Sequence, residues 1–361
     1  MASIGDTALF ETAATLPAAA RMAFARDADD NPFRSAAWFD ILARSCAVPE
    51  SRPCILASAD GALVAPLALR LDRAGRHLES WSNFYSCDFS PLCGYGVPAI
   101  QAAGFASGLA ALRPRVDTLH LRDMRADTVD VAALATALRR AGWWTQPYEQ
   151  TGNWHEDVRG VDFDHYLAVR DGKLRATIER RTRRFRSLPG ARLTIAQDPA
   201  GLDGALDAYL AMHARSWKRP EPFPCFIPAF VHGFARLGML RIGVASIEGR
   251  PVAAQIWLLW RRRATIVKLA HDEAARDLSP GTVLTAWMIR TALERQDLDE
   301  IDFGRGDDPY KRLWLRQRRP IQALVAGNAR TPRGLAAAFR HLGPPVARRA
   351  MHALGLRFTS D

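Results

Sequence analysis

Apolar residues in the first half of the chain follow two different spacings. Residues 35–44 repeat them at helical spacing, which predicts a helix. Two continuous apolar runs, residues 53–58 and 63–71, are separated by Ala59-Asp60-Gly61, a pattern typical of two strands joined by a tight turn. The buried face of the first helix is expected to hold Trp38, Phe39, Ile41 and Leu42. The other elements predicted here are a helix over 101–112, a strand over 118–122 and a helix over 131–141.

The second half repeats this order of elements. Residues 203–217 are predicted to form a helix that buries Leu206, Tyr209, Leu210 and His213. Two apolar runs at 240–247 and 251–259 flank Glu248-Gly249-Arg250 and predict a second pair of strands with a tight turn. The remaining predicted elements are a strand over 263–271, a helix over 280–295 and a strand that ends at 301–303.

The two halves can be aligned on their strand pairs. Residues 56–65 match residues 244–253, and in both halves a helix and a strand ending in charged residues follow. This repetition indicates a diverged duplication of one α/β unit with a mixed sheet; the alternative is that unrelated strand pairs resemble each other. The predicted division is an N-terminal half (1–160), a basic helical connector (161–190), a second domain (191–330) and a basic tail (331–361).

Charge and cysteine content narrow the choice of partners only slightly. A net charge of +11 favours anions such as nucleic acid, lipid head groups or phosphate-bearing small molecules, but enrichment in arginine is also what a GC-rich coding background produces. The five cysteines form no CxxC pair, which argues against a disulfide framework or a zinc site, and we expect no metal. The N-terminus lacks the pattern of a signal peptide and the longest apolar run is too short to span a bilayer, so we expect a cytoplasmic protein.

Two groups of basic residues stand out. The chain contains only four lysines, and where arginine is the usual basic residue a lysine is a candidate for a specific task, with chance retention as the alternative. Residues 173–186 predict an amphipathic helix covered with arginine, which is either a solvated connecting face or a surface for a polyanion such as tRNA. The four lysines are Lys173, Lys218, Lys268 and Lys311.

The segment Arg276-Asp277-Leu278-Ser279-Pro280-Gly281-Thr282 leads into a predicted helix. Ser279 suits the N-cap and Pro280 suits the first helical position. The amides of Gly281, Thr282 and Val283 are then expected to point outward at the positive end of the helix dipole, which is a place for a phosphate group.

Polar residues cluster at the ends of two predicted strands. Asp302 is expected to point into a buried site, where Arg305, Lys311 or a substrate amine would pair with it; the alternative is a surface turn. His271 ends the preceding strand and is either a base near neutral pH or a structural residue. Tyr310 carries a hydroxyl that can give or take a proton, and the aromatic and proline-rich segment 217–224 is either a pocket wall or a rigid connection.

At these residues the second half resembles the BioF2-like acetyltransferase domain of the GNAT superfamily, which includes CelD-like proteins. The resemblance covers residues 203–328, and the two-half plan is more remotely similar to Fem-type aminoacyltransferases. This sequence differs from the family in the phosphate loop: the usual pattern is Q/R-x-x-G-x-G/A, whereas residues 276–281 contain one glycine. The motifs that carry the resemblance are Trp217-Lys218, 249–254, 268–272, 279–282, 302–304 and 308–311.

This resemblance implies two tandem GNAT-like halves with one active site, in which an amine attacks the thioester of acyl-CoA that carries an acetyl or a longer acyl group (acetyl-CoA in the simplest case). Asp302 or His271 would take the amine proton, Tyr310 would protonate the thiolate, and amides near 270–272 would bind the oxyanion. The alternatives are an aminoacyl-tRNA-dependent transferase and a non-catalytic scaffold for polysaccharide or lipid assembly. The expected donor-binding residues are Arg276, Ser279, Gly281, Thr282 and Val283, and the expected acceptor-binding residues are Trp217, Lys268, Asp272, Arg305, Asp307, Asp308 and Lys311.

Overall fold

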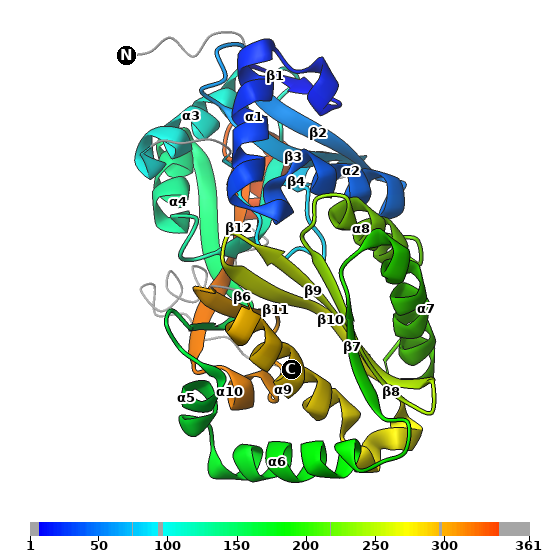
Figure 1. Ribbon diagram of the computed structural model, residues 1–361. Helices are drawn as coiled ribbons and strands as arrows, with labels where there is room; N and C mark the ends of the chain where they lie inside the picture. The colour runs from blue at the N-terminus through cyan, green and yellow to red at the C-terminus, as the bar shows by residue number, and fades with distance from the viewer. Residues whose placement is uncertain (1–6, 74, 93–96, 217, 296–297, 339–361) are drawn as a thin grey trace, which may run out of the picture. The chain divides into compact units, whose positions relative to one another are not determined.

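A computed structural model describes residues 7–73, 75–92, 97–216, 218–295 and 298–338 (Figure 1). The chain divides into two compact units. Unit 1 contains residues 1–36, 47–150 and 320–361, and unit 2 contains residues 37–46 and 151–319. The chain therefore passes between the units four times: at residues 36–37, at residues 46–47, and within two long strands, β6 (Trp143–Asp157) and β12 (Gln317–Asn328).

Unit 1 is built on a mixed sheet. Strands β1 to β4 pair antiparallel in chain order, β4 pairs in parallel with β5, and β12 pairs antiparallel with β5. The strands are β1 (Thr7–Phe10), β2 (Ser51–Ser58), β3 (Val64–Asp72), β4 (Gly75–Ser80) and β5 (Thr118–Arg125). Unit 1 contains the helices α1 (Ala18–Asp30), α3 (Pro98–Ala111) and α4 (Val131–Arg140); α2 (Ala36–Ser45) lies between β1 and β2 in the chain but belongs to unit 2 from residue 37 on.

Unit 2 repeats this pairing. Strands β7 to β10 pair antiparallel in chain order, β10 pairs in parallel with β11, and the second part of β6 pairs antiparallel with β11. The strands are β7 (Arg192–Ala196), β8 (Leu240–Ile247), β9 (Arg250–Trp260), β10 (Arg263–His271) and β11 (Glu300–Arg305). The helices are α5 (Phe163–Ala168), α6 (Gly172–Arg186), α7 (Pro199–Arg215), α8 (Phe226–Ala235), the 3₁₀ helix η3 (Glu273–Leu278), α9 (Pro280–Arg295) and α10 (Lys311–Trp314).

The predicted α/β class with a mixed sheet is confirmed, and the repeated pairing supports the duplication. Gly61 and Gly249 occupy the same place in the two tight turns, with φ of 74° and 78°, a backbone conformation that glycine adopts without steric cost. The last strand of each sheet comes from a distant part of the sequence, because β5 pairs with β12 and β11 pairs with β6. Neither of these pairings could be read from the local spacing of apolar residues.

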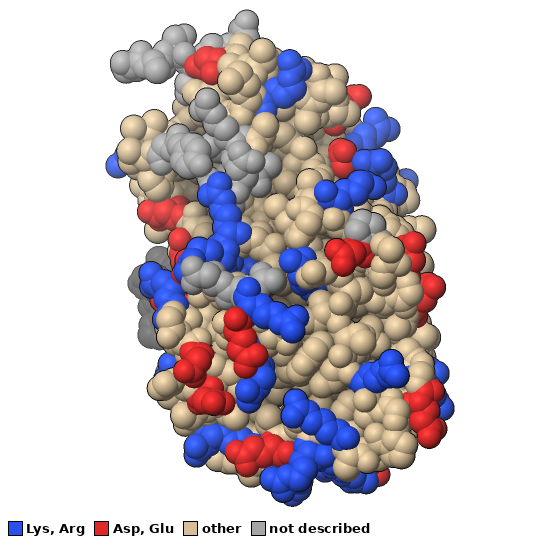
Figure 2. Space-filling view, in the orientation of Figure 1, with Lys and Arg blue, Asp and Glu red and all other residues tan. Residues whose placement is uncertain are grey.

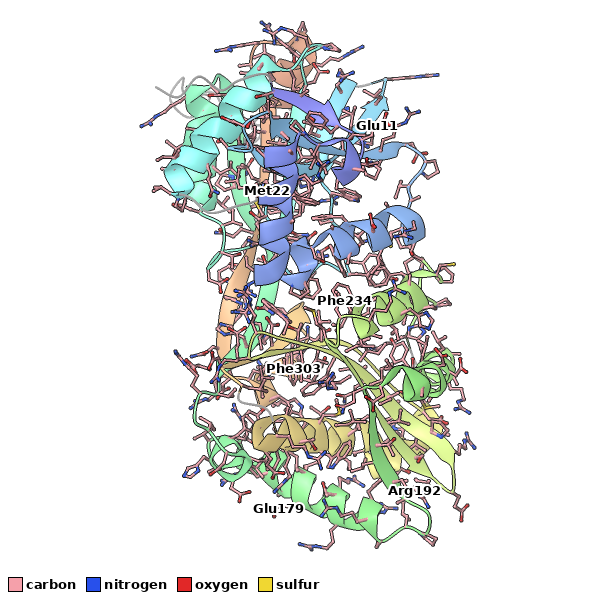
Figure 3. The ribbon with its side chains drawn as sticks, turned by 45° about the horizontal axis from the view of Figure 1, so that its top comes forward. Glu11, Met22, Glu179, Arg192, Phe234 and Phe303 are labelled. Atoms are coloured by element: carbon pink, nitrogen blue, oxygen red, sulfur yellow. The ribbon has the colours of Figure 1, made fainter. Side chains whose placement is uncertain are left out.

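The core of unit 2 lies between α9 and the sheet. Phe303 of β11, labelled in Figure 3, belongs to it together with Val283, Leu284 and Trp257. In α2, the Trp38 ring packs edge-on to Phe226 and Phe230 of α8. One predicted core position in α7 is wrong: Leu210 is exposed. The buried face of that helix instead follows Leu202, Leu206, Tyr209 and Met212.

None of the helices in the described part of the chain combines the length and the apolar character that a membrane-spanning segment needs. The predicted basic tail begins as a helix over residues 332–338, and its remainder, including Gly343-Pro344-Pro345, lies outside the described residues.

Candidate functional site

Strands β10 and β11 diverge soon after they begin. Their parallel pairing covers three residue pairs and ends at Thr265 and Asp302. Beyond that point β10 continues along β9, with a register shift between Ile266 and Lys268, and β11 shifts its register against β6 after Asp302. Among the described residues, no strand pairs with the edge of β10 that faced β11 between Ile266 and His271.

The backbone groups that face this open edge follow from the ladder between β10 and β9. The Asp272 amide donates to the Val252 carbonyl at 2.9 Å, so Ala270, two residues earlier, also faces β9. Leu269 and His271 then direct their amides and carbonyls to the open edge, and the Leu269 carbonyl does accept a hydrogen bond there, from Lys218. Of the predicted oxyanion donors, the His271 amide points to the open edge. The Asp272 amide already donates to the Val252 carbonyl, so the prediction of Asp272 as an oxyanion donor is wrong.

The turn into α9 presents two amides. Ser279 has φ of 51° and ends η3, because its amide donates to the carbonyl of Arg276. Ser279 occupies the predicted N-cap position, because α9 begins at Pro280, but this left-handed conformation is not the extended one of an ordinary N-cap, and its hydroxyl accepts no hydrogen bond from the described amides. Among the described residues, nothing accepts a hydrogen bond from the amides of Gly281 and Thr282.

The third predicted phosphate donor is not available. The Val283 amide donates to the Ser279 carbonyl at 3.1 Å, which is the first hydrogen bond of the helix, and the Val283 side chain is fully buried. The helix N-terminus therefore offers two unpaired amides and the positive end of its dipole.

A buried polar side chain in β9 holds this turn in place. Gln255 donates through Nε2 to Thr285 Oγ1 at 2.6 Å, and Thr285 donates to the Gly281 carbonyl at 2.8 Å. The Oε1 atom of Gln255 accepts from Trp257 Nε1 at 2.9 Å. Gln255 interrupts an apolar strand, and that interruption was the one sequence signal of its role.

We expect Gln255→Met to lower the free energy of unfolding by about 1–3 kcal/mol, because the buried Trp257 N–H loses its acceptor. Urea denaturation followed by tryptophan fluorescence measures this change. The same substitution at the exposed Gln146 serves as the control and should change stability by less than about 0.5 kcal/mol. Equal effects at the two positions would show that the Gln255 network does not hold the turn.

The two sides of β10 carry different polar groups. Lys268 pairs with Glu221 Oε1 at 2.6 Å, whereas the His271 ring lies against Gly281 and its Nε2 is 3.3 Å from Glu273 Oε1. The predicted alternation of Lys268 and His271 is thus observed, and His271 lies beside the helix start.

Asp272 is buried and anchors η3. It accepts from the Ala274 amide at 3.0 Å and from Arg250 Nη2 at 3.0 Å. Burial raises the pKa of Asp272, but the Ala274 amide, Arg250 and Arg215 outweigh it and hold the pKa below its ordinary value.

Asp302 is buried in a polar network at the point where the strands diverge. Its Oδ1 accepts from Asn153 Nδ2 and from the Gly304 amide, both at 2.6 Å, and its Oδ2 accepts from Arg319 Nη2 at 2.5 Å. Arg319 also binds Glu300. The cation that binds Asp302 is therefore Arg319 and not Arg305 or Lys311, because the fold brings β12 beside β11 only in the tertiary structure.

The loop after β11 is held by two ion pairs, by a hydrogen bond from Trp154 and by a contact of Lys311 with a backbone carbonyl. Asp307 accepts from Arg318 and from Trp154 Nε1, and Arg318 lowers the pKa of Asp307. Lys311 is buried, donates to the Arg305 carbonyl at 2.6 Å and lies 3.4 Å from Asp308. The aspartate next to Lys311 is therefore Asp308 and not Asp302, and Asp307 binds Arg318.

Tyr310 lies at the edge of this loop. Its ring is 6.3 Å from that of Phe303, its side chain is partly exposed, and burial of the hydroxyl raises the pKa of Tyr310. A tyrosine in this environment keeps its proton at neutral pH, as a proton donor must.

The end of α7 and the segment between α7 and α8 contribute a cluster of polar side chains, of which the sequence predicted only some members. Lys218 donates from Nζ to the Leu269 carbonyl at 2.5 Å, and His213 Nε2 lies 3.5 Å from Glu221 Oε1. The Tyr209 hydroxyl is buried and has no hydrogen-bond partner among the described residues. The scarcity of lysine was the signal for Lys218; the predicted acceptor-binding residue Trp217 lies outside the described residues.

The corresponding opening in unit 1 is closed. Strands β4 and β5 also pair over three residues, but Ser80 Oγ then accepts from the Arg122 amide at 2.6 Å and donates to the Arg122 carbonyl. Farther along β5, the Asp123 carboxylate accepts a hydrogen bond from the Ser82 hydroxyl, and the Asp123 backbone carbonyl accepts one from the Phe89 amide. The strand edge that is open in unit 2 is therefore occupied by protein in unit 1.

Helix α6 carries a basic surface next to the turn. Leu174, Ile178 and Phe185 are buried as predicted, and Arg181 and Arg184 donate to the Asp277 carbonyl of η3. Figure 2 shows basic side chains gathered over this helix at the lower edge of the view, and Glu179 is labelled on it in Figure 3. The exposed basic residues are Lys173, Arg175, Arg180, Arg183, Arg184 and Arg186.

Residues 172–312 match the family model described as the acetyltransferase (GNAT) domain. This segment is a GNAT domain. It lies within unit 2 and contains β10, the turn into α9, β11 and Lys311. The diverging strands and the helix start of unit 2 are therefore features of a GNAT domain.

Solved structures share the fold over about four fifths of the chain. FemX is 9% identical, with 80% of this chain and 90% of that chain covered and a TM-score of 0.55. A conserved protein of unknown function from Bacteroides thetaiotaomicron is 10% identical, with 81% and 89% covered and a TM-score of 0.52. At these identities the likeness concerns the fold alone. No curated protein matches the sequence.

Proposed function

We propose that unit 2 transfers an acyl group from acyl-CoA to an amine. The observation that carries this proposal is the early divergence of β10 and β11, with two unpaired amides of α9 at the end of the opened strand edge. A site of this shape holds an extended thioester along β10 and its diphosphate at the helix start.

The residues at the helix start fit the phosphates of the donor. Gly281 and Thr282 supply amides, and Gly281 has no side chain to keep a ligand from the backbone. The arginines of α6, two of which contact Asp277, add positive charge beside the same turn. This arrangement replaces the first glycine of the usual phosphate loop with a sharp turn at Ser279.

The remaining residues of the site have complementary roles in this proposal. The amides of Leu269 and His271 face the developing oxyanion, and His271 takes a proton from the attacking amine. Tyr310 protonates the departing thiolate. Asp302, whose oxygens accept from Arg319, Asn153 and Gly304, acts as a positioning residue for the turn at Gly304.

Donor binding is tested by a charge change at the helix start. In a thermal-shift assay with acetyl-CoA, we expect Tm of the wild-type protein to rise by several degrees, because a ligand of the native state stabilises it. In the Thr282→Glu variant the added carboxylate repels the diphosphate, and we expect at least tenfold weaker binding, a cost of about 1.4 kcal/mol.

The matched control for this experiment is Thr282→Gln, which has the same size without the charge and should bind nearly as the wild type does. The carboxylate also suits a helix N-terminus, so Thr282→Glu should not unfold the protein. Equal acetyl-CoA affinity of the two variants would refute the assignment of this turn to the donor phosphates.

The basic face of α6 favours a second candidate, a transferase that takes its acyl group from aminoacyl-tRNA. Under the proposed function, tRNA should bind only weakly and be released by about 200 mM salt. Fluorescence anisotropy with labelled bulk tRNA, for the wild type and for Arg180→Gln/Arg183→Gln, measures this. Strong tRNA binding that the double substitution weakens, together with no thermal shift from any acyl-CoA, would replace the first candidate with the second.

A further inference from the structure

The proposed function requires an acceptor amine at the open edge of β10, where the acyl carbonyl of the donor lies, and Lys218 is at this edge. It follows α7, and its Nζ donates to the Leu269 carbonyl on the open edge of β10 at 2.5 Å. The Leu269 amide faces the same edge, because the N–H and C=O of one residue point to the same side of an antiparallel strand. An acyl carbonyl bound by that amide therefore lies next to the lysine nitrogen.

The surroundings of Lys218 favour its neutral, nucleophilic form. Burial, the nearby Lys268 and the more distant Lys311 lower its pKa, Glu221 and Asp308 oppose them, and the result is a pKa of about 8 in place of 10.5. His213, from α7, has its own pKa lowered by burial and adds no full positive charge near neutral pH. At pH 8 about half of the Lys218 side chains are then neutral, compared with about 0.3% for an ordinary lysine.

We propose that Lys218 is itself acylated by the donor bound in unit 2, so that this protein modifies its own site when no amine substrate is present. The inference rests on the proposed function, because it uses the same donor site. A bond forms between Lys218 Nζ and the acyl carbon, and the bond between that carbon and the thiol sulfur breaks. The proton lost by the amine balances the proton gained by the thiolate, and free thiol leaves.

The product of this step is an amide, which does not pass its acyl group on as a thioester does. Acylation also removes the positive charge of Lys218 and the hydrogen-bond donors that now hold it to Leu269. The modification is therefore lasting, and it changes the strand edge along which the donor binds.

The other three lysines provide internal references within the same protein. Lys173 is exposed on α6, Lys268 is paired with Glu221 at 2.6 Å, and Lys311 is held by Asp308 and by the Arg305 carbonyl. The surroundings of these three lysines differ from those of Lys218. A comparison of acetylation rates at the four lysines by peptide mass spectrometry therefore separates specific acylation of Lys218 from general chemical acylation.

The experiment incubates the full chain with acetyl-CoA, without added amine, between pH 6.5 and 9.5. Mass spectrometry of digested samples then follows the gain of one acetyl group at each lysine. We expect Lys218 to be acetylated at least tenfold faster than Lys173, with a rate that rises with pH and levels off above about pH 8. The rate at Lys173 should continue to rise over the whole range.

Two variants complete the test. Lys218→Arg should remove the fast modification, and Thr282→Glu should slow it by the factor by which it weakens acetyl-CoA binding. If acetyl-CoA raises Tm but Lys218 reacts no faster than Lys173, the inference is wrong and the proposed function stands. If acetyl-CoA neither raises Tm nor acetylates Lys218, both fail. The wild-type comparison between two lysines decides the question even if Lys218→Arg does not fold.

Discussion

Glu156→Gln is expected to lower the free energy of unfolding by about 3–5 kcal/mol. Glu156 lies in β6 and is fully buried with Arg170, which binds both of its oxygens at 2.6 and 2.8 Å. Arg316 adds a backbone and a side-chain hydrogen bond, both at 2.9 Å. Removal of the negative charge leaves the Arg170 guanidinium buried without a counterion, which is the costly outcome for a buried pair.

This pair also positions the proposed site. Arg170 lies 4.0 Å above the ring of Tyr166, whose hydroxyl donates to the Trp314 carbonyl at the end of α10. The contacts of Trp314 and Arg316 thus hold the chain directly after the loop that contains Tyr310. The loss of stability should therefore be accompanied by a loss of transferase activity.

Urea denaturation followed by tryptophan fluorescence measures the change, and Glu294→Gln is the matched control. Glu294 forms an exposed ion pair with Arg290 at 3.4 Å, so its replacement should cost less than about 0.5 kcal/mol. A Glu156→Gln variant as stable as the Glu294→Gln variant would refute this account of the network.

The same pair gives the wild-type protein a defined dependence on pH. Burial raises the pKa of Glu156, but Arg170 and Arg316 outweigh it and hold the pKa below its ordinary value of 4.5. A carboxyl group with a lowered folded-state pKa contributes stability above its unfolded pKa and loses it as the pH falls through the folded value. The difference in stability between wild type and Glu156→Gln should therefore be largest above about pH 5 and shrink at lower pH.

Tyr310→Phe is expected to reduce turnover about 100-fold while acetyl-CoA affinity stays within twofold of wild type. The substitution removes only the hydroxyl that we propose as the acid for the departing thiolate. The ring contact with Phe303 remains, and the structure shows no hydrogen bond of the hydroxyl to a described residue, so folding should be unaffected.

Release of free thiol from acetyl-CoA, measured with a panel of primary amines as acceptors, reports turnover, and thermal shift reports donor affinity. Tyr148→Phe is a suitable control, since both tyrosines are 39% exposed and Tyr148 lies in unit 1. Wild-type turnover in Tyr310→Phe would remove this residue as the acid. A variant that loses donor affinity in proportion to rate would give it a binding role instead.

Local spacing was sufficient for elements whose partners are close in the sequence. β8, β10 and α9 begin and end at the predicted residues, and the turns at Gly61 and Gly249 were identified from their residue types. Spacing did not predict several other elements, among them β1, α1, β4, β6, α5, β7, α8 and β12. In β6 the residues after Trp143 are largely polar and partly exposed, so they lack the apolar run from which the other strands were recognised.

The sequence by itself determined the α/β class, the repeated order of elements and the position of the turn into α9, because each depends on spacing or on residue types within one short segment. The tertiary structure alone decided that Arg319 is the partner of Asp302, that Glu156 binds Arg170 and Arg316, and that Lys218 meets the Leu269 carbonyl. These contacts join residues from separate elements, and most of their energy arises from burial. Burial is a property of the packed chain and has no counterpart in the order of residues along it.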